Sequence, residues 1–173
     1  MNLLEVLWVF LISAAPIVEL RLAIPIAINE YNIDWYYAFL ICVAGNILPV
    51  PFILWFLSPV SDILSRISIF NALIQWVFKY TRQRGGLVEK YGKLGLIILV
   101  AIPLPGTGAW TGSLVAFLLG VDFKSAFYCI LVGVIIAGII VTILSLLGWT
   151  GAIIAGAVLF VFVILHFWRR MQA

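Results

Sequence analysis

Three long stretches without a charged residue constrain this chain more than any other feature. No Asp, Glu, Lys or Arg occurs in residues 35–61, 94–121 or 125–168. Each stretch is long enough to cross a hydrocarbon core of about 30 Å as a helix. Because the chain is also 65% apolar and only 10% charged, we expect an all-α integral membrane protein.

The N-terminal apolar run does not have the pattern of a secretory signal peptide. It lacks a basic start, and Glu19 and Arg21 follow where a cleavage site would be expected. We therefore expect the run to remain in the mature protein. The two cysteines, Cys42 and Cys129, fall inside hydrophobic stretches without metal-ligand spacing, so we expect structural roles for both and no metal or cofactor.

Basic residues gather in one stretch between hydrophobic regions. Six of the ten Lys and Arg side chains lie there: Arg66, Lys79, Arg82, Arg84, Lys90 and Lys93. Cytoplasmic loops of membrane proteins carry such an excess, so residues 62–93 and the C-terminal Arg169-Arg170 are predicted to face the cytoplasm. Within 59–84, apolar residues recur at helical spacing, which predicts an amphipathic helix on the inner leaflet. The net charge of +3 gives no case for nucleic-acid binding.

The stretch 94–121 is predicted to enter and leave the membrane on one face. As a straight helix its 28 residues would extend about 42 Å, but prolines and glycines interrupt it at 103–108. The uninterrupted arm 94–102 would reach about 14 Å, or half the hydrocarbon thickness. A re-entrant hairpin also leaves Lys124 and Arg169-Arg170 on the cytoplasmic side.

The N-terminal region has a similar break, from Ala14-Ala15-Pro16 to Glu19, and we interpret it as a second re-entrant hairpin. An offset of 88 residues aligns 33–35 with 121–123 and Gly45 with Gly133. The order of hairpin, acidic turn and long span thus occurs twice, with opposite predicted topology. The predicted architecture is a single membrane domain over 1–173 with two re-entrant hairpins, about three full transmembrane helices and one amphipathic interfacial helix, arranged as an inverted repeat. Its parts are the first repeat (1–58), the amphipathic helix and basic loop (59–93), the second repeat (94–147) and a C-terminal span (148–173).

Glu19 and Arg21 are the first candidates for a binding site. A charged side chain within a membrane costs about 2.5–3.5 kcal/mol on insertion scales, so each needs a partner or water. Two positions apart, they would not share a face of a regular helix, but breaks at Pro16 and Pro25 could bring both to one cavity. The alternative is that they lie at the outer interface, or simply pair with each other.

The second hairpin carries a further group of candidates at its break. Exposed backbone N–H groups of the glycines and of the following helix could bind an anion, with hydroxyl donors and an aromatic wall beside them. The candidates are Pro103, Pro105, Gly106, Thr107, Gly108, Trp110 and Thr111. The alternative is that the glycines only allow a tight turn and close packing.

Asn46, inside an uncharged span, is a candidate lining residue, although such residues often only bond to a neighbouring helix. The glycine spacing does not fit a dinucleotide fingerprint. No nucleophile–base set or paired carboxylate site occurs, so we do not expect an enzyme.

The strings ELRLAIP at 19–25 and PLPGTGAWTG at 103–112 resemble the prokaryotic family of small multidrug export proteins over residues 1–150. That family is distantly similar to the DedA superfamily, whose members carry two re-entrant hairpins and move lipids such as undecaprenyl phosphate between leaflets. The resemblance implies roles for Glu19 and Pro25, which match an acidic residue before a proline. The arginines that DedA proteins carry around the second Pro-Gly are absent here.

The sequence favours a transporter or lipid translocase that moves a small anionic or lipid-phosphate substrate through a site between the two hairpins. The alternatives are a proton-coupled exporter of amphiphilic cations and a non-transporting membrane scaffold. We expect membrane lipids and a small-molecule or lipid substrate as partners, proton coupling through Glu19, a homodimer or larger homo-oligomer, and a location in the prokaryotic inner membrane.

Overall fold

The computed structural model describes residues 2–64, 88, 91–104, 107–148 and 151. These residues contain α-helices and no strand. The helices are α1 (Leu3–Ala14), α2 (Glu19–Asn29), α3 (Trp35–Ile47), α4 (Pro49–Leu64), α7 (Lys93–Ala101), α8 (Ala109–Leu118) and α9 (Phe123–Leu146). Two of the described helical segments, Trp35–Phe56 and Phe123–Leu146, are long and apolar enough to cross a membrane. The expectation of an all-helical membrane protein is confirmed at this level.

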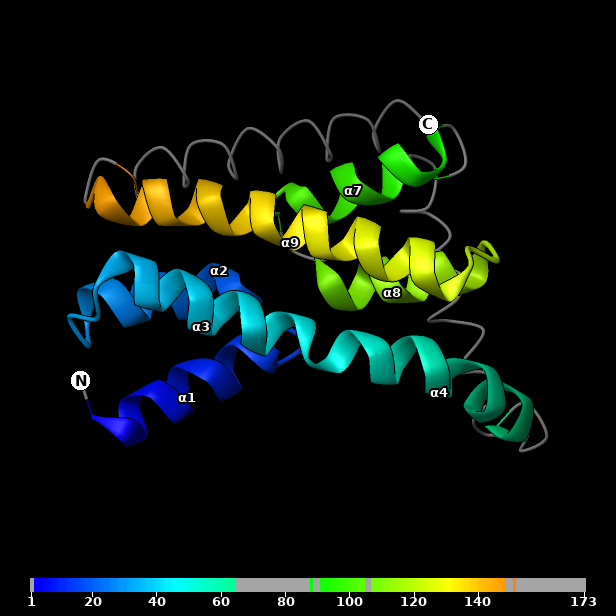
Figure 1. Cartoon of the computed structure of the whole chain (residues 1–173), viewed down its shortest axis with the longest axis horizontal. Helices are drawn as coiled ribbons and strands as arrows, with labels where there is room; N and C mark the ends of the chain where they lie inside the picture. The colour runs from blue at the N-terminus through cyan, green and yellow to red at the C-terminus, as the bar shows by residue number, and fades with distance from the viewer. Residues whose placement is uncertain (1, 65–87, 89–90, 105–106, 149–150, 152–173) are drawn as a thin grey trace, which may run out of the picture.

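Two pairs of short helices approach each other along the long axis of the molecule (Figure 1). The first helix pair, α1 and α2, turns back at residues 15–18. The second helix pair, α7 and α8, turns back between Ala101 and Ala109. We call residues 14–21, which include the start of α2, the first turn, and the described residues 102–104 and 107–110, which include the start of α8, the second turn. In Figure 1 the first pair extends from one end of the molecule and the second from the other, so the two turns meet near the middle.

The longer helices run beside both pairs. Helices α3 and α4 follow one another along the length of the molecule, and α9 runs in the opposite direction (Figure 1). Helix α1 packs on α3, α2 packs on both α3 and α9, α7 packs on α9, and α8 packs on α4 and α9. The meeting point of the turns therefore lies inside a frame of long helices.

Glycines permit close contact between a long helix and the first helix of each short pair. A Cβ atom at Gly45 of α3 would lie 2.5 Å from the backbone oxygen of Phe10 on α1. At Gly133 of α9, it would lie 2.6 Å from the Cβ of Val100 on α7. Each glycine lets a long helix pack directly against the first helix of its pair. These are the two glycines that the sequence aligned at an offset of 88 residues.

The predicted helix breaks agree with the observed ones. Helix α1 ends at Ala14, two residues before Pro16, and α7 ends at Ala101, two residues before Pro103. Pro25 behaves differently from our expectation, because α2 runs through it without a break. Helix α4 continues through Pro59 to Leu64, where the amphipathic helix was predicted to begin. The rest of that helix, the basic loop and most of the C-terminal span lie outside the described residues.

Candidate functional site

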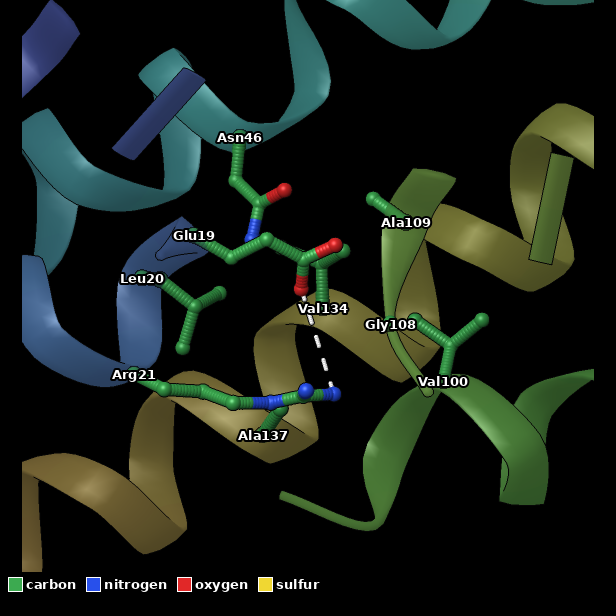
Figure 2. Close-up of a pocket in the computed structure, with 9 residues that line it drawn as sticks. All are labelled: Glu19, Leu20, Arg21, Asn46, Val100, Gly108, Ala109, Val134 and Ala137. Atoms are coloured by element: carbon green, nitrogen blue, oxygen red, sulfur yellow. Dashed lines mark ion pairs between the residues drawn. The ribbon is translucent and has the colours of Figure 1, made fainter. Parts of the chain in front are cut away.

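Glu19 begins α2 with a backbone conformation that is rare for a residue with a side chain. Its φ angle is 51°, in the left-handed region, where Cβ crowds the following carbonyl. Such strain is commonly found where function requires it. The side chain is only 3% exposed and points from the first turn toward the second (Figure 2).

The Glu19 carboxyl group occupies the N-terminal end of α8. Its Oε1 accepts from the backbone N–H of Trp110 at 3.4 Å, and its Oε2 lies 3.9 Å from the Arg21 guanidinium. A Cβ atom at Gly108 would overlap the carboxyl group, and Gly108 itself has a φ angle of 111°. A glycine is therefore required on two grounds at this point of the second turn.

Arg21 reaches across to the second turn. Its guanidinium donates to the backbone oxygen of Leu104 at 2.5 Å, to Thr107 Oγ1 at 2.8 Å and to the backbone oxygen of Ile102 at 3.4 Å. The carbonyls of Ile102 and Leu104 lie beyond the end of α7 at Ala101 and also accept from the N–H groups of Leu104 and Thr107. Arg21 therefore adds its planar fork of donors to hydrogen bonds that the segment after α7 already makes with itself.

The second turn returns a contact to the first. The indole Nε1–H of Trp110 donates to the backbone oxygen of Ala14 at 3.1 Å. Ala14 is the last residue of α1, so its carbonyl also lacks a partner within its helix. We expected Trp110 to form an apolar wall, whereas its polar edge joins the two pairs.

Asn46 on α3 lies beside the Glu19 carboxyl group and points into the same space (Figure 2). It is 1% exposed. Its Oδ1 atom has no hydrogen-bond partner among the described residues. Buried side-chain oxygens are rarely left in this state.

These side chains surround a small recess between α2, α3, α7, α8 and α9. Its lining residues are Glu19, Leu20, Arg21, Asn46, Val100, Gly108, Ala109, Val134 and Ala137. Among the described residues the packing leaves no space for even a water molecule. The site is therefore closed in this conformation.

The structure brings together some of the predicted site residues and places others apart. Glu19, Arg21, Asn46 and Gly108 line the recess, and Thr107 and Trp110 bond to the first pair. Pro25, Pro103 and Thr111 are partly buried but do not line it. Pro105 and Gly106 lie outside the described residues.

Sequence analysis missed the apolar wall that α9 contributes through Val134 and Ala137. The sequence of α9 does contain a pattern that indicates this contact face. Gly133 and Ala137 are small residues four positions apart within an otherwise bulky span, and this pattern is typical of a helix face in close contact with others.

A comparison with protein-family models gives one match. The model described as "Putative small multi-drug export protein" matches residues 19–140. This range begins at Glu19 and contains every residue that lines the recess. No curated protein and no solved structure matches the chain.

Proposed function

The chain belongs to the small multi-drug export protein family, and from this we propose that it exports amphiphilic cations through the recess between its two turns. Glu19 is the cation-binding group in this proposal. The family name supports an export function and a small-molecule substrate in a membrane. The proposed substrate class depends on how closely the Glu19 carboxylate and the Arg21 guanidinium are paired with other groups.

The observation that carries the proposal is that the carboxylate is weakly paired and the guanidinium is strongly paired. The contacts of the Glu19 carboxyl group with the Trp110 N–H and with the Arg21 guanidinium measure 3.4 and 3.9 Å, which is long for a charge-assisted hydrogen bond. Arg21 has acceptors at 2.5 and 2.8 Å on the second turn. The positive group beside Glu19 is thus the Arg21 guanidinium at 3.9 Å, whose shorter contacts go to the second turn.

Charge magnitudes point the same way. An anion bound about 4 Å from Glu19 would be repelled by about 4 kcal/mol at an effective dielectric constant of about 20, whereas a cation would gain a similar amount. Arg21 repels the same cation with a full charge that hydrogen bonds to neutral carbonyl groups do not remove, so the preference for a cation depends on its lying closer to Glu19 than to Arg21. A cation can approach Glu19 while Arg21 keeps those partners.

Membrane placement follows from helix length. Helices α1, α2, α7 and α8 have 12, 11, 9 and 10 residues, or about 14 to 18 Å each. That is about half of the hydrocarbon core. We propose that both helix pairs are re-entrant, entering from opposite faces, with Trp35–Phe56 and Phe123–Leu146 as full spans.

An inverted repeat is supported by matched details of the two halves. Asp34 and Asp122 precede α3 and α9 with similar extended backbones, and Gly45 and Gly133 permit equivalent close contacts. Inverted repeats are common in transporters with sites at the membrane midplane. We further propose that the basic loop and C-terminus face the cytoplasm of a prokaryotic cell and that a homodimer completes the walls.

In the proposed cycle, a proton and the substrate compete for Glu19. A carboxylate that binds a proton loses the charge that holds a cation, so proton entry from outside releases the substrate there. The recess is closed in this conformation, so the turns must separate to admit a substrate. Separation breaks the contacts of Arg21 with Leu104 and of Trp110 with Ala14.

Lipid-phosphate translocation is the second candidate function. It is favoured by Arg21, whose side chain is 15% exposed, together with Thr107 and the N-terminal end of α8. In this conformation Glu19 occupies that helix end. A phosphate group would first have to displace it.

Transport in reconstituted liposomes tests the proposal. With an imposed proton gradient, wild-type protein should accumulate a cationic dye, and Glu19→Gln should not, because the amide cannot exchange a proton for a cation. Glu5→Gln is the control, since Glu5 lies at the exposed start of α1 and bonds only to Asn2. If the dye stays outside while a labelled lipid phosphate crosses leaflets faster than in empty liposomes, lipid translocation replaces cation export.

A further inference from the structure

We propose that the exported cation must carry N–H groups, because Asn46 Oδ1 accepts a hydrogen bond from the same ammonium group that Glu19 binds. The inference rests on the proposed function and names its substrate class more closely. Primary and secondary amines, protonated at neutral pH, meet the requirement. Quaternary ammonium ions have no N–H and do not.

The buried amide of Asn46 supplies the first argument. The residue lines the recess and is 1% exposed, yet Oδ1 has no partner among the described residues. The NH2 end of an amide is the donor and suits the neighbouring carboxylate, which leaves the oxygen as an acceptor. An acceptor buried without a donor costs free energy, and a ligand that donates to it recovers that cost.

The neighbours of Asn46 supply the second argument. Most other residues that line the recess are apolar or lack a side-chain donor: Leu20, Val100, Gly108, Ala109, Val134 and Ala137. Arg21 directs its close contacts to Leu104 and Thr107 on the second turn. Among the described residues that line the recess, no donor bonds to Oδ1, so a bound ammonium group can supply one.

Geometry adds the third argument. Glu19 comes from α2 and Asn46 from α3, and in Figure 2 the two side chains converge, with Asn46 beside Glu19 and the Glu19 carboxyl group extending toward Gly108. Two neighbouring acceptor groups fit a group with two N–H bonds, one for each. Methylation removes these donors while leaving the charge, so the charge attracts both kinds of cation and the hydrogen bonds separate them.

The experiment compares a secondary alkyl amine that carries an aromatic ring with its N,N-dimethylated quaternary analogue on the purified full chain, by binding calorimetry at neutral pH, where the amine is protonated. Wild-type protein should bind the amine more tightly than the quaternary ion by about tenfold or more, the usual scale of a lost hydrogen bond to a charged group. Asn46→Leu, which keeps the branching of the side chain without its polar atoms, should lower that ratio several-fold, and the part that remains comes from the hydrogen bond to Glu19.

Thr142→Val serves as the control. Thr142 on α9 is also buried, and its Oγ1 has no partner among the described residues, but it does not line the recess. The ratio of amine affinity to quaternary-ion affinity in Thr142→Val should equal that of the wild type. A change of ratio as large as that of Asn46→Leu would overturn the role of Asn46.

The remaining outcomes separate the inference from the proposed function. If wild-type protein binds both ions equally, the inference is overturned and cation export stands. If Asn46→Leu keeps the wild-type ratio, Asn46 is not the acceptor and the inference is overturned. If neither ion binds, cation export itself is overturned. Should Asn46→Leu not fold, Asn46→Ala takes its place in the same comparison.

Discussion

The two turns meet at one point but contribute different chemistry to it. The first turn supplies charged side chains, Glu19 and Arg21. The second turn lies in a stretch without any charged residue, from 94 to 121, and supplies backbone carbonyl and N–H groups. The first turn therefore supplies the charges, and the second turn supplies the backbone groups that bind them.

This difference shows how broken helices are tolerated in an apolar setting. A break leaves carbonyl groups without partners at the end of one helix and N–H groups at the start of the next. Arg21 binds the carbonyls of Ile102 and Leu104, and Glu19 accepts from the N–H of Trp110. The anion position that the sequence suggested for a substrate is filled here by the protein's own carboxylate.

The largest effect should come from removing the space that the second turn leaves for Glu19. Gly108→Ala places a Cβ into the Glu19 carboxyl group and strains a backbone with φ of 111°. We expect export to fall by more than about tenfold, since the turns can no longer meet in this arrangement. Gly120→Ala is the control: it has φ of 67° but no neighbour within 4 Å. Equal losses in both variants would mean that backbone strain alone matters.

A smaller effect should follow from changing Arg21 to Lys. An ammonium group keeps the charge but cannot reproduce the fork that binds both Leu104 and Thr107. We expect export to fall several-fold with the protein still folded. Lys93→Ala, which removes a contact with Ser125 on the exposed end of α9, should leave export unchanged. Full export by Arg21→Ala would contradict any need for this contact.

Trp110→Phe tests the contact that the second turn returns to the first. The change keeps the ring and removes the Nε1 donor to Ala14, which should lower stability by about 1 kcal/mol. Thermal unfolding in detergent measures the effect. Trp8→Phe is the control, because Trp8 is 59% exposed and should face lipid. A melting temperature lowered equally by both changes would show that the hydrogen bond adds nothing.

The smallest effect distinguishes the starts of the two long helices. Asp122 accepts from the N–H of Ser125 at 2.9 Å, whereas Asp34 makes no side-chain cap bond to α3. Asp122→Ala should therefore lower the melting temperature more than Asp34→Ala. The Ser125 N–H holds the pKa of Asp122 below its ordinary value. The difference in melting temperature between the two variants should therefore be fully present above about pH 3.9, the ordinary aspartate pKa. It should be lost as the pH falls further, through the lowered pKa of Asp122 in the folded protein.

Local features of the fold could be predicted from sequence, because proline and glycine act on the backbone where they stand. The arm predicted at 94–102 is α7 at Lys93–Ala101, and the break at Ala14 is α1's end. Pro25 did not act as a breaker. It is the seventh residue of α2, beyond the first helical turn, in which proline costs no hydrogen bond, so the helix continues despite the lost bond, as helices in membranes often do.

The contacts between the turns could not be predicted in the same way. Arg21 and Leu104 are 83 residues apart, and Glu19 and Trp110 are 91 apart. No periodicity within one helix specifies such a pairing. The composition of the chain shows that the charges need partners, but only the packing of the two pairs identifies carbonyl groups and N–H groups as those partners.

Proton release on substrate binding tests most directly whether Glu19 exchanges a proton for a cation. Purified wild-type protein in weakly buffered detergent should release protons when a cationic substrate is added, over a pH range in which Glu19 binds a proton in part of the population. Glu19→Gln should release none, and Glu5→Gln should release as much as the wild type. Substrate binding without proton release at any pH, or release that persists in Glu19→Gln, would contradict the account.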